Sequence, residues 1–341
     1  MLASVRMIRK VKCIDAHVGG APVRLLVDGV PRPSGQTLSQ KRGWMQRHAD
    51  ALRRQVMLEP RGHADMSGVL LTEPVSPGAH AGLLFMDAGG YLRLCGHAVI
   101  AAATIAVERD LILVQGDAPT LVFDTPAGAV HAHMRLLPRG DRRRVDSVTF
   151  TNVPSFVAVG GHPVRLGSRE LRVDVAFGGL FYAIVDTEAI GIPLDGPRLP
   201  ELRRLAAQIR EAVEADGAAV HPQDRSAAGL DGVIFTGPPR DPEAHLRNVT
   251  VSSSGAVDRS PSATGTSAVM AVLDAMGLLH EEGAFVHESL IGSLHRGRVA
   301  RRTQVGELPA IIPEIEGSAW ITGEHSLLVD EEDPLKDGFQ I

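Results

Sequence analysis

The chain has 341 residues, of which 44% are hydrophobic and 22% charged, and its formal net charge is −5. This composition is typical of a globular protein, and the length predicts two domains. The negative charge argues against nucleic acid or an anionic membrane as the main partner. No apolar stretch reaches membrane-spanning length, and the basic start, 1–12, lacks a signal-peptide core. Two cysteines are too few for a disulfide framework, so we expect a protein of the reducing cytoplasm.

Strands outnumber helices in the predicted secondary structure. Clusters of Val, Ile and Leu bounded by Gly and Pro predict strands, for example at 23–27, 68–72, 82–86 and 173–185. Periodic apolar residues predict helices at 37–54, 97–109, 199–214 and 264–277. The second and the fourth of these helices are apolar nearly all round, which is typical of helices buried on every side. Many short strands and two such helices predict an α/β (α+β) fold with curled sheets.

A change of domain is expected near residue 150. The basic run at 139–144 lies beside Pro138 and contains Gly140, and we interpret it as a solvated loop between the domains. The first half is then 1–150, completed by a strand-like segment that begins at residue 319 and by the residues after it, about 319–341. The second half is 151–318.

The two halves repeat the same order of elements. The stretch that begins at Gly68 is echoed by one that begins at Gly232. Each is preceded by a predicted amphipathic helix and followed by one of the two apolar helices. A single match would carry little weight, but three matches in register indicate an internal duplication.

Each apolar helix begins beside a small residue that can carry a proton. Cys95 stands at the start of the first helix, and Ser262 stands at the start of the second. The free backbone N–H groups of a helix start attract anions and stabilise a thiolate. Two such starts facing one another would hold a carboxylate between two proton-transfer positions. The pattern therefore predicts chemistry at a carbon next to a carboxylate.

These residues also have ordinary structural interpretations. A lone cysteine is usually a small buried residue, and we interpret Cys13, in the middle of a predicted strand, in that way. A serine before a helix is most often an N-cap, so Ser262 has two readings. Asp258 is a turn residue or a contact for a substrate amine, and His97 is a polar helix-start residue or a donor to the substrate. Cys95 is interpreted as catalytic because its position favours the thiolate.

Common motifs of other enzyme classes are absent from the sequence. It contains no glycine-rich dinucleotide motif opening a helix, no Walker-type lysine loop and no Gly-x-Ser-x-Gly elbow. The run at 280–282 lacks the second histidine of a zinc motif. His131 and His133 share one face of a predicted strand, and we interpret that face as exposed rather than metal-binding. No metal site is therefore expected.

At these residues the chain resembles the proline racemase superfamily, which includes proline racemases, hydroxyproline epimerases and trans-3-hydroxy-L-proline dehydratases. The matching stretches cover nearly the whole length, at 15–20, 59–66, 95–98, 152–156, 174–179 and 258–261. The resemblance implies a fold like that of diaminopimelate epimerase: two pseudo-symmetric domains, each a curled sheet around a central helix, with the active site in the cleft between them. It also implies no cofactor, a small imino acid as substrate and a homodimer.

Carried over by position, the resemblance implies a role for each residue of the first helix start. Cys95 would be the first proton-transfer residue. Gly96 and His97 would bind the substrate, through a backbone N–H and a side chain respectively. Asp258, from the second half, would contact the ring nitrogen of the substrate.

At the second helix start, Ala263 and Thr264 would offer backbone N–H groups to the substrate carboxylate. Ser262 departs from the family pattern, because racemases and epimerases usually have cysteine there and the dehydratases typically have threonine. Ala263 also replaces a common glycine. The hydroxyl group at position 262 favours the dehydratase type.

A single thiol suits dehydration better than inversion. Inversion of an α-carbon needs an acid–base group on both faces, whereas Cys95 and Ser262 offer one thiol and one alcohol. In trans-3-hydroxy-L-proline the α-hydrogen and the hydroxyl lie on the same ring face, so one thiolate could remove the hydrogen and return a proton to the leaving hydroxide. We expect 1-pyrroline-2-carboxylate and water as products, with Ser262 holding a water or the substrate.

Two alternatives remain open at this point. One is a 4-hydroxyproline epimerase or a proline racemase in which Ser262 works through a water. The other is a catalytically inactive imino-acid binding protein, which would exchange no α-hydrogen.

Overall fold

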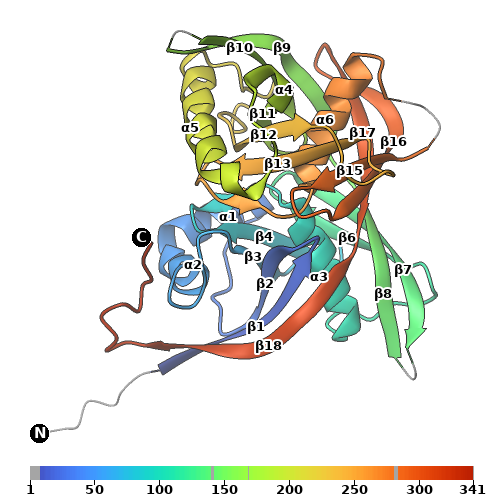
Figure 1. The fold of residues 1–341 in the computed structure, drawn as a ribbon. Helices are drawn as coiled ribbons and strands as arrows, with labels where there is room; N and C mark the ends of the chain where they lie inside the picture. Colours follow the sequence, from blue (N-terminus) through green and yellow to red (C-terminus); the bar gives the residue numbers. More distant parts are fainter. Residues whose placement is uncertain (1–7, 140–141, 168, 280–282, 341) are drawn as a thin grey trace, which may run out of the picture.

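The computed structural model describes residues 8–139, 142–167, 169–279 and 283–340, which fold into two lobes (Figure 1). Its mixed sheet and few helices make this an α+β fold, so the predicted class is confirmed. Within the described ranges, no helix is long and apolar enough to cross a membrane. The run at 280–282 lies outside these ranges.

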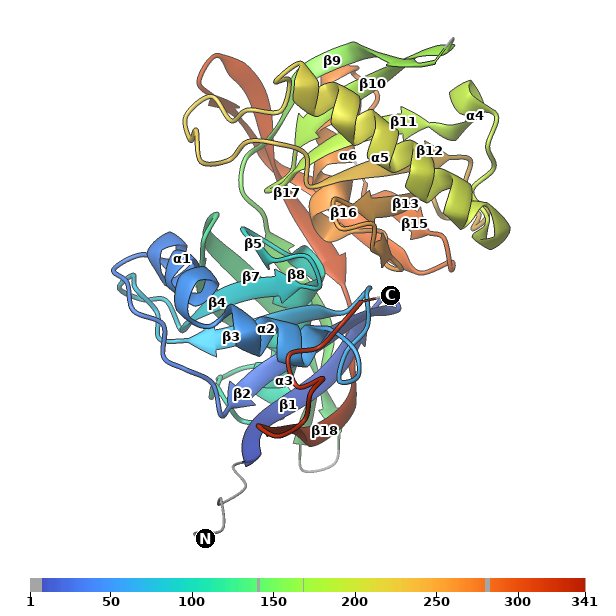
Figure 2. The same cartoon turned by 90° about the vertical axis from the view of Figure 1, so that its left-hand side faces the viewer.

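The lower lobe of Figure 1 contains the first eight strands and the last one. These strands are β1 (Ile8–Val18), β2 (Ala21–Asp28), β3 (Ser67–Thr72), β4 (Ala81–Asp87), β5 (Tyr91–Leu92), β6 (Thr120–Thr125), β7 (Gly128–Arg139), β8 (Arg142–Thr151) and β18 (Ala319–Asp330). Pairing runs from β18 through β1, β2, β3, β4 and β6 to β7 and β8. The sheet curls around helix α3 (Gly96–Glu108) (Figure 2). The two end strands of this sheet, β18 and β8, both pack against the helix.

The upper lobe contains the strands that lie between β8 and β18 in the sequence. They are β9 (Ser155–Leu166), β10 (Arg169–Phe177), β11 (Phe181–Asp186), β12 (Gly232–Gly237), β13 (Leu246–Ser252), β14 (Val257–Asp258), β15 (Phe285–Ser289), β16 (Leu294–Val305) and β17 (Leu308–Gly317). Pairing runs from β9 through β10, β11, β12, β13, β15 and β16 to β17, and β17 returns to pair with β9. This closed sheet surrounds helix α6 (Ala263–Ala275).

The two lobes repeat one order of connections. In the lower lobe, helices α1 (Leu38–His48) and α2 (Asp50–Met57) connect the parallel strands β2 and β3. In the upper lobe, α4 (Thr187–Ile190), the 3₁₀ helix Gly196–Arg198 and α5 (Leu199–Ala215) connect the parallel strands β11 and β12. The central helices α3 and α6 then lie in the connections of two further parallel pairs, β4–β6 and β13–β15. The duplication inferred from the sequence is thus present in the topology. The likeness to diaminopimelate epimerase stays a prediction.

The two central helices are buried on nearly every side, as their composition predicts. Every residue of α3 is buried except His97 and Glu108, and α6 is buried from Ala263 to Val272. Both helices contribute to one hydrophobic core that also contains strand residues of both lobes. Their many alanines allow the surrounding strands to approach closely. Because the helices cannot shift without disrupting this core, they fix the positions of the residues at their starts.

The predicted helix at 37–54 is two helices rather than one. Ala49, with φ −142°, separates α1 from α2, and Asp50 begins the second helix, where a carboxylate is favourable. The break allows both helices to bury apolar residues in one core beneath them, including Met45 from α1 and Val56 from α2. The segment 173–185 likewise forms two antiparallel strands, β10 and β11, which a turn at Gly178 and Gly179 joins.

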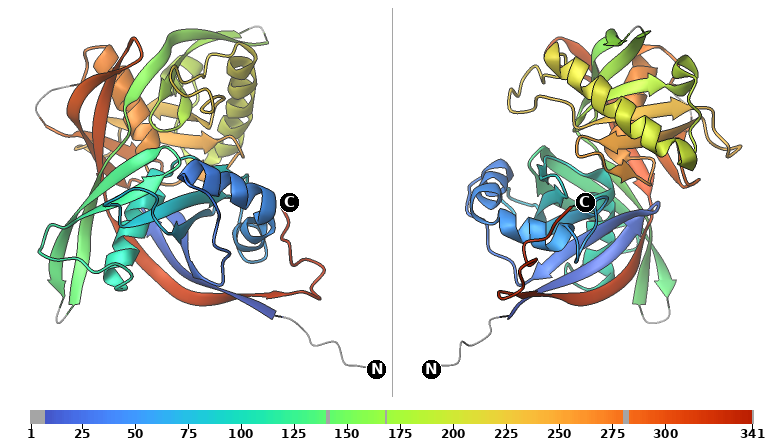
Figure 3. Two further views of the ribbon diagram at one scale, coloured as in Figure 1. Left: turned by 180° about the vertical axis from the view of Figure 1, so that it is seen from behind. Right: turned by 60° about the vertical axis from the view of Figure 1, so that its left-hand side comes forward.

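The interpretation of the basic run as a loop between domains is wrong. Its described residues belong to the β7–β8 hairpin of the lower lobe, while residues 140 and 141 lie outside the described ranges. Leu136 and Val145 pair across this hairpin and are both buried in the core, so the apolar alternation extends the strands to its end. The chain instead passes to the upper lobe at 152–154, between β8 and β9 (Figure 3).

Candidate active site

A small cavity lies where the two lobes meet. Its volume is about 90 Å³, well above the roughly 10–15 Å³ that a cavity needs to hold one water molecule. Its polar lining comes from both lobes and includes Asp65, Ser67, Cys95, His97, Tyr182, Asp258, Ser262 and Thr264. Of the residues that the sequence singled out, all but Ala263 line this cavity. Its size suits a single small molecule.

The starts of α3 and α6 meet at this cavity. Cys95 is the N-cap residue of α3, and Ser262 is the N-cap residue of α6. A Cβ atom added to Gly96 would lie 2.6 Å from the Cβ of Ala263, so the two starts touch only because Gly96 has no side chain. The first N–H groups of both helices lack intrahelical acceptors. The arrangement therefore directs two sets of N–H groups towards one small space, which favours an anion.

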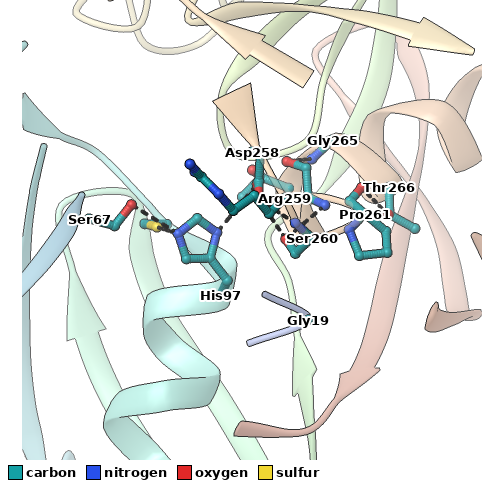
Figure 4. A network of polar contacts seen from close by, with 12 residues as sticks. Gly19, Ser67, His97, Asp258, Arg259, Ser260, Pro261, Gly265 and Thr266 are labelled. Carbon is teal, nitrogen blue, oxygen red and sulfur yellow. Dashed lines mark hydrogen bonds and ion pairs between the residues drawn. The ribbon is translucent and has the colours of Figure 1, made fainter. Parts of the chain in front are cut away.

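His97 contacts the only thiol that lines the cavity. Its Nε2 lies 3.3 Å from the Sγ of Cys95 and 3.0 Å from the Oγ of Ser67 on β3. Figure 4 shows Ser67 and His97 side by side above the start of α3. The other cysteine, Cys13, lies in the core beneath α1 and α2, where burial raises its pKa to about 12. Cys95 is therefore the cysteine available for chemistry in the cavity.

His97 also forms an ion pair across the two lobes. Its Nδ1 lies 3.5 Å from the Oδ2 of Asp258, and each side chain is only 12% exposed. Burial alone would lower the pKa of His97, but the negative charges of Cys95 and Asp258 outweigh burial and raise this pKa well above its usual range. Burial favours the neutral acid at Asp258, yet the positive charge of His97 and hydrogen bonds from Ser260 lower the pKa of this carboxyl. The positive His97 ring thus lies between the sulfur of Cys95 and the carboxylate of Asp258.

A short turn holds Asp258 and Ser262 in place. The backbone N–H and the hydroxyl of Ser260 both donate to Oδ1 of Asp258, each at 2.8 Å. The Oγ of Ser260 in turn accepts from the N–H of Ser262 at 3.1 Å. Ser262 has φ +60° and ψ 103°, a conformation that costs a non-glycine residue on the order of 1–3 kcal/mol. Strain of this kind persists where the surrounding structure enforces it, here at the cavity wall.

Ser262 is both an N-cap and a cavity residue. Its Oγ accepts a hydrogen bond from the N–H of Gly265 at 3.3 Å, so the structural interpretation of this serine holds. The side chain is also at the cavity wall, opposite the start of α3. Next to it, the hydroxyls of Thr264 and Tyr182 are 2.7 Å apart, and burial raises the pKa of Tyr182. The second helix start therefore presents hydroxyl groups where the first presents a thiol.

Two further carboxyl groups, of Asp87 and Asp231, line the cavity wall. Burial raises the pKa of both, and that of Asp231 to about 6. A raised pKa means that both carboxyl groups take up a proton more readily than an exposed aspartate does.

A family model described as proline racemase matches residues 13–340. The chain belongs to the proline racemase family. A trans-3-hydroxy-L-proline dehydratase of Bacillus cereus is 40% identical over 326 residues, which cover 96% of each chain. A proline racemase of Clostridioides difficile is 38% identical over 340 residues, which cover 98% of this chain and 99% of that one.

Among solved structures, a hydroxyproline epimerase from Agrobacterium vitis with bound trans-4-hydroxy-L-proline superposes on this chain with a TM-score of 0.91. The two are 30% identical, and the match covers 99% of this chain and 96% of that one. Proteins of the proline racemase family with dehydratase, racemase and epimerase names are therefore all similar to this chain. The family shows an enzyme, while the reaction has to be argued from the site.

This member of the proline racemase family also has site residues that the sequence did not reveal. Ser67 and Tyr182 lie on strands that reach the cavity, and no local pattern marks them. Asp65 lies within the stretch 59–66 that resembles the family, but no role was assigned to it from the sequence. Ser260 was detectable, because an Asp followed two residues later by Ser is a common side-chain-to-backbone turn.

The histidine pair at 131 and 133 is placed on the exposed face of β7, as interpreted from the sequence. His133 lies 2.7 Å from the hydroxyl of Thr120 on the neighbouring strand β6. Among the described residues, no group of three or more His, Cys, Asp or Glu side chains could hold a metal ion.

Proposed function

We propose that this enzyme dehydrates trans-3-hydroxy-L-proline to 1-pyrroline-2-carboxylate and water, with Cys95 as the base. The observation that carries the proposal is the asymmetry of the two helix starts, which offer one thiol and one alcohol. Relatives named trans-3-hydroxy-L-proline dehydratase, at 38–40% identity, support the same reaction. In this proposal the two lobes act as epimerase-like halves that enclose the substrate.

The reaction needs a proton acceptor on only one face of the substrate ring. The Cys95 thiolate removes the α-hydrogen, and the electrons of that C–H bond form the double bond to the neighbouring carbon as its bond to the hydroxyl oxygen breaks. The proton on Cys95 passes to the departing hydroxide, which gives water and restores the thiolate. The enamine product then tautomerises to the cyclic imine. No external oxidant or reductant is needed.

The surrounding residues are suited to the charges that develop. The positive His97 ring, 3.3 Å from the sulfur, interacts favourably with the thiolate. Asp258 would accept a hydrogen bond from the ring nitrogen of the substrate. The N–H groups at Gly96, Ala263 and Thr264 would stabilise negative charge on the substrate carboxylate as the α-hydrogen leaves. Ser262 would hold a water or the substrate on the opposite face.

The alternative is a 4-hydroxyproline 2-epimerase or a proline racemase. It is favoured by the fold of the Agrobacterium vitis epimerase, whose bound ligand is trans-4-hydroxy-L-proline, and by the racemase relative at 38% identity. In that case Ser262 would have to exchange protons on the second face, directly or through a water. A serine hydroxyl is a much weaker acid–base group near neutral pH than a thiol.

The proposed reaction is tested with the purified protein and trans-3-hydroxy-L-proline. We expect a cyclic imine that borohydride reduces to proline, and we expect Cys95→Ala to form none because the base is lost. Cys13→Ala is the matched control, since its thiol lies in the core of the lower lobe and should not affect turnover. The absence of imine together with epimerised 4-hydroxyproline would replace the proposal by the alternative.

A further inference from the structure

We propose that Asp65 is a positioning residue that joins the two lobes and holds Asp258 beside His97. Asp65 belongs to the lower lobe, in the loop between α2 and β3. Its partners belong to β14 and the residue after it in the upper lobe. The inference rests on the proposed function to the extent that Asp258 binds the substrate there.

The carboxylate of Asp65 binds the residues on both sides of Asp258. Its Oδ1 accepts a hydrogen bond from the backbone N–H of Val257 at 3.0 Å. Its Oδ2 accepts one from Nη2 of Arg259 at 2.8 Å. The Asp65 side chain is 14% exposed, so this ion pair is partly shielded from water. Charge-assisted hydrogen bonds of this kind are about twice as strong as neutral ones.

The strand that carries Asp258 has little support of its own. β14 contains two residues and pairs with β13 through Val257 and Asp258. Val257 is buried, and a buried N–H without an acceptor is costly. Asp65 supplies that acceptor. The position of the Asp258 carboxylate, 3.5 Å from His97, therefore depends on a residue of the opposite lobe.

The loop that carries Asp65 is itself ordered by short-range contacts. The N–H of Asp65 donates to Nδ1 of His63 at 3.2 Å, and the N–H of Met66 donates to the backbone oxygen of His63 at 2.9 Å. These contacts order the backbone on both sides of the Asp65 side chain.

Other polar contacts cross between the lobes without touching β14. Arg93 of the lower lobe donates to Asp224 and Ser226 of the upper lobe. Ser293 of the upper lobe donates to the backbone oxygen of Gly19 at 2.8 Å. These contacts hold the lobes together. Asp65 does the same, but its contacts also hold the segment that carries Asp258.

A third partner of Asp65 provides an internal control. Nη2 of Arg203, on α5, lies 3.5 Å from Oδ1 of Asp65, and the Arg203 side chain is 46% exposed. Arg259 and Arg203 are both arginines beside the same carboxylate, but only Arg259 is next to Asp258. If the role of Asp65 is to place Asp258, loss of the Arg259 side chain should raise KM and loss of the Arg203 side chain should not.

The experiment measures kcat and KM for imine formation with Asp65→Ala, Asp65→Asn, Arg259→Gln and Arg203→Gln. We expect Asp65→Ala to raise KM about tenfold, the factor that corresponds to one hydrogen bond to a charged group. Asp65→Asn keeps an acceptor for Val257, so its KM should rise less. Arg259→Gln should raise KM by the same factor as Asp65→Asn, because each change removes the same ion pair. The double variant Asp65→Asn with Arg259→Gln should therefore raise KM no further than either single change. In each case kcat should change less than KM.

Asp124→Ala is the control for a merely structural effect. Its carboxylate is buried and accepts N–H bonds from Val75 and Ser76 at 2.7 and 2.8 Å, away from the cavity. We expect this change to lower the melting temperature and leave KM unchanged. Equal effects of Arg203→Gln and Arg259→Gln, or an unchanged KM in Arg259→Gln, would overturn the role of Asp65.

The role of Asp65 can fail independently of the proposed reaction. If the wild type forms no imine, the same variants are compared by α-hydrogen exchange of proline and 4-hydroxyproline in D₂O. A KM shift in that reaction would support the role of Asp65 although dehydration is excluded. If the wild type forms the imine and the variants show no change in KM, only the proposed role of Asp65 is excluded. If the wild type shows neither imine formation nor α-hydrogen exchange, both the proposed reaction and the role of Asp65 are excluded.

Discussion

At the scale of single residues, the site is organised around the ring of His97. His97 contacts the sulfur of Cys95 with one ring nitrogen and faces Asp258 with the other. Because opposite charges outweigh the burial of the ring, its positive form is favoured where an isolated buried histidine would be neutral. In the positive form each ring nitrogen carries a proton, so Nε2 faces the sulfur of Cys95 and Nδ1 faces the carboxylate of Asp258 as donors.

The residue that distinguishes this site is Ser262, which stands where a second thiol would allow inversion. Replacing Ser262 with Cys places an acid–base group of suitable pKa on the second face of the ring. We expect the variant to gain α-hydrogen exchange and epimerisation of 4-hydroxyproline that the wild type lacks. Both are measured by deuterium incorporation and by polarimetry. Ser262→Ala is the matched variant and should gain neither.

A wild type that already epimerises 4-hydroxyproline at the rate of the Ser262→Cys variant would contradict this expectation. It would mean that the alcohol at position 262 transfers protons as well as a thiol does.

At the scale of elements, the site depends on the close approach of two buried helices. Gly96 begins α3 and Ala263 begins α6, and their contact leaves no space for another carbon atom. The surrounding sheets prevent either helix from moving away, because α3 and α6 are each enclosed by the strands of one lobe. The separation of the two helix starts is therefore set by packing and not by the sequence of either helix alone.

Gly96→Ala tests this close approach. The new Cβ would lie 2.6 Å from the Cβ of Ala263 and 2.9 Å from Cζ of Phe150, so the helix starts must move apart. Overpacking of this kind costs about 1–3 kcal/mol, and we expect that loss in the free energy of unfolding measured with urea. The displaced helix starts should also lower kcat/KM by about tenfold or more.

Gly323→Ala on β18 is the matched control, because its added Cβ meets nothing within 4 Å and its φ is not positive. Activity and stability of this control should remain near those of the wild type. A Gly96→Ala enzyme with full activity would show that the helix starts need not touch.

At the scale of the whole molecule, two strands near the lobe boundary bury neutral histidines. His287 on β15 and His295 on β16 are fully buried, and burial lowers their pKa values to about 3 and about 4. The ring of His295 packs beside Gly317, the last residue of β17 before the chain returns to the lower lobe. Protonation of these rings is thus disfavoured in the folded state.

The protein should therefore lose stability in mild acid. Between about pH 6.5 and pH 4 the unfolded chain binds a proton at each of these histidines that the folded chain does not bind. From pH 7 to pH 5 the free energy of unfolding should fall by about 3–4 kcal/mol from these two residues. His97 and Asp231 offset part of this fall, because their pKa values are raised in the folded state and both therefore gain stability as the pH falls from 7 to 5.

Urea unfolding at pH 7 and pH 5 measures this dependence. His287→Gln should make the fall in unfolding free energy smaller by about 2 kcal/mol, because one of the two buried rings is gone. An unfolding free energy that is equal at both pH values would contradict the expectation. So would a change in unfolding free energy between the two pH values that is the same in His287→Gln as in the wild type.

The amino-acid sequence by itself determined the features that repeat or that follow a local period. It predicted two helices buried on every side, an internal duplication, and Cys95 and Ser262 at the two helix starts. These predictions succeed because apolar periodicity and helix-start chemistry are properties of a few neighbouring residues. The same local reasoning misplaced the basic run 139–144, because the buried pair Leu136 and Val145 extends a hairpin through it.

Only the tertiary structure decided which distant residues share the cavity. Ser67 reaches His97 from β3, Tyr182 reaches Thr264 from β11, and Asp65 reaches both neighbours of Asp258 from the other lobe. None of these pairs is close in sequence, so no periodicity or spacing records them. They depend on strand register and on the packing of one lobe against the other, which emerge only when the whole chain has folded.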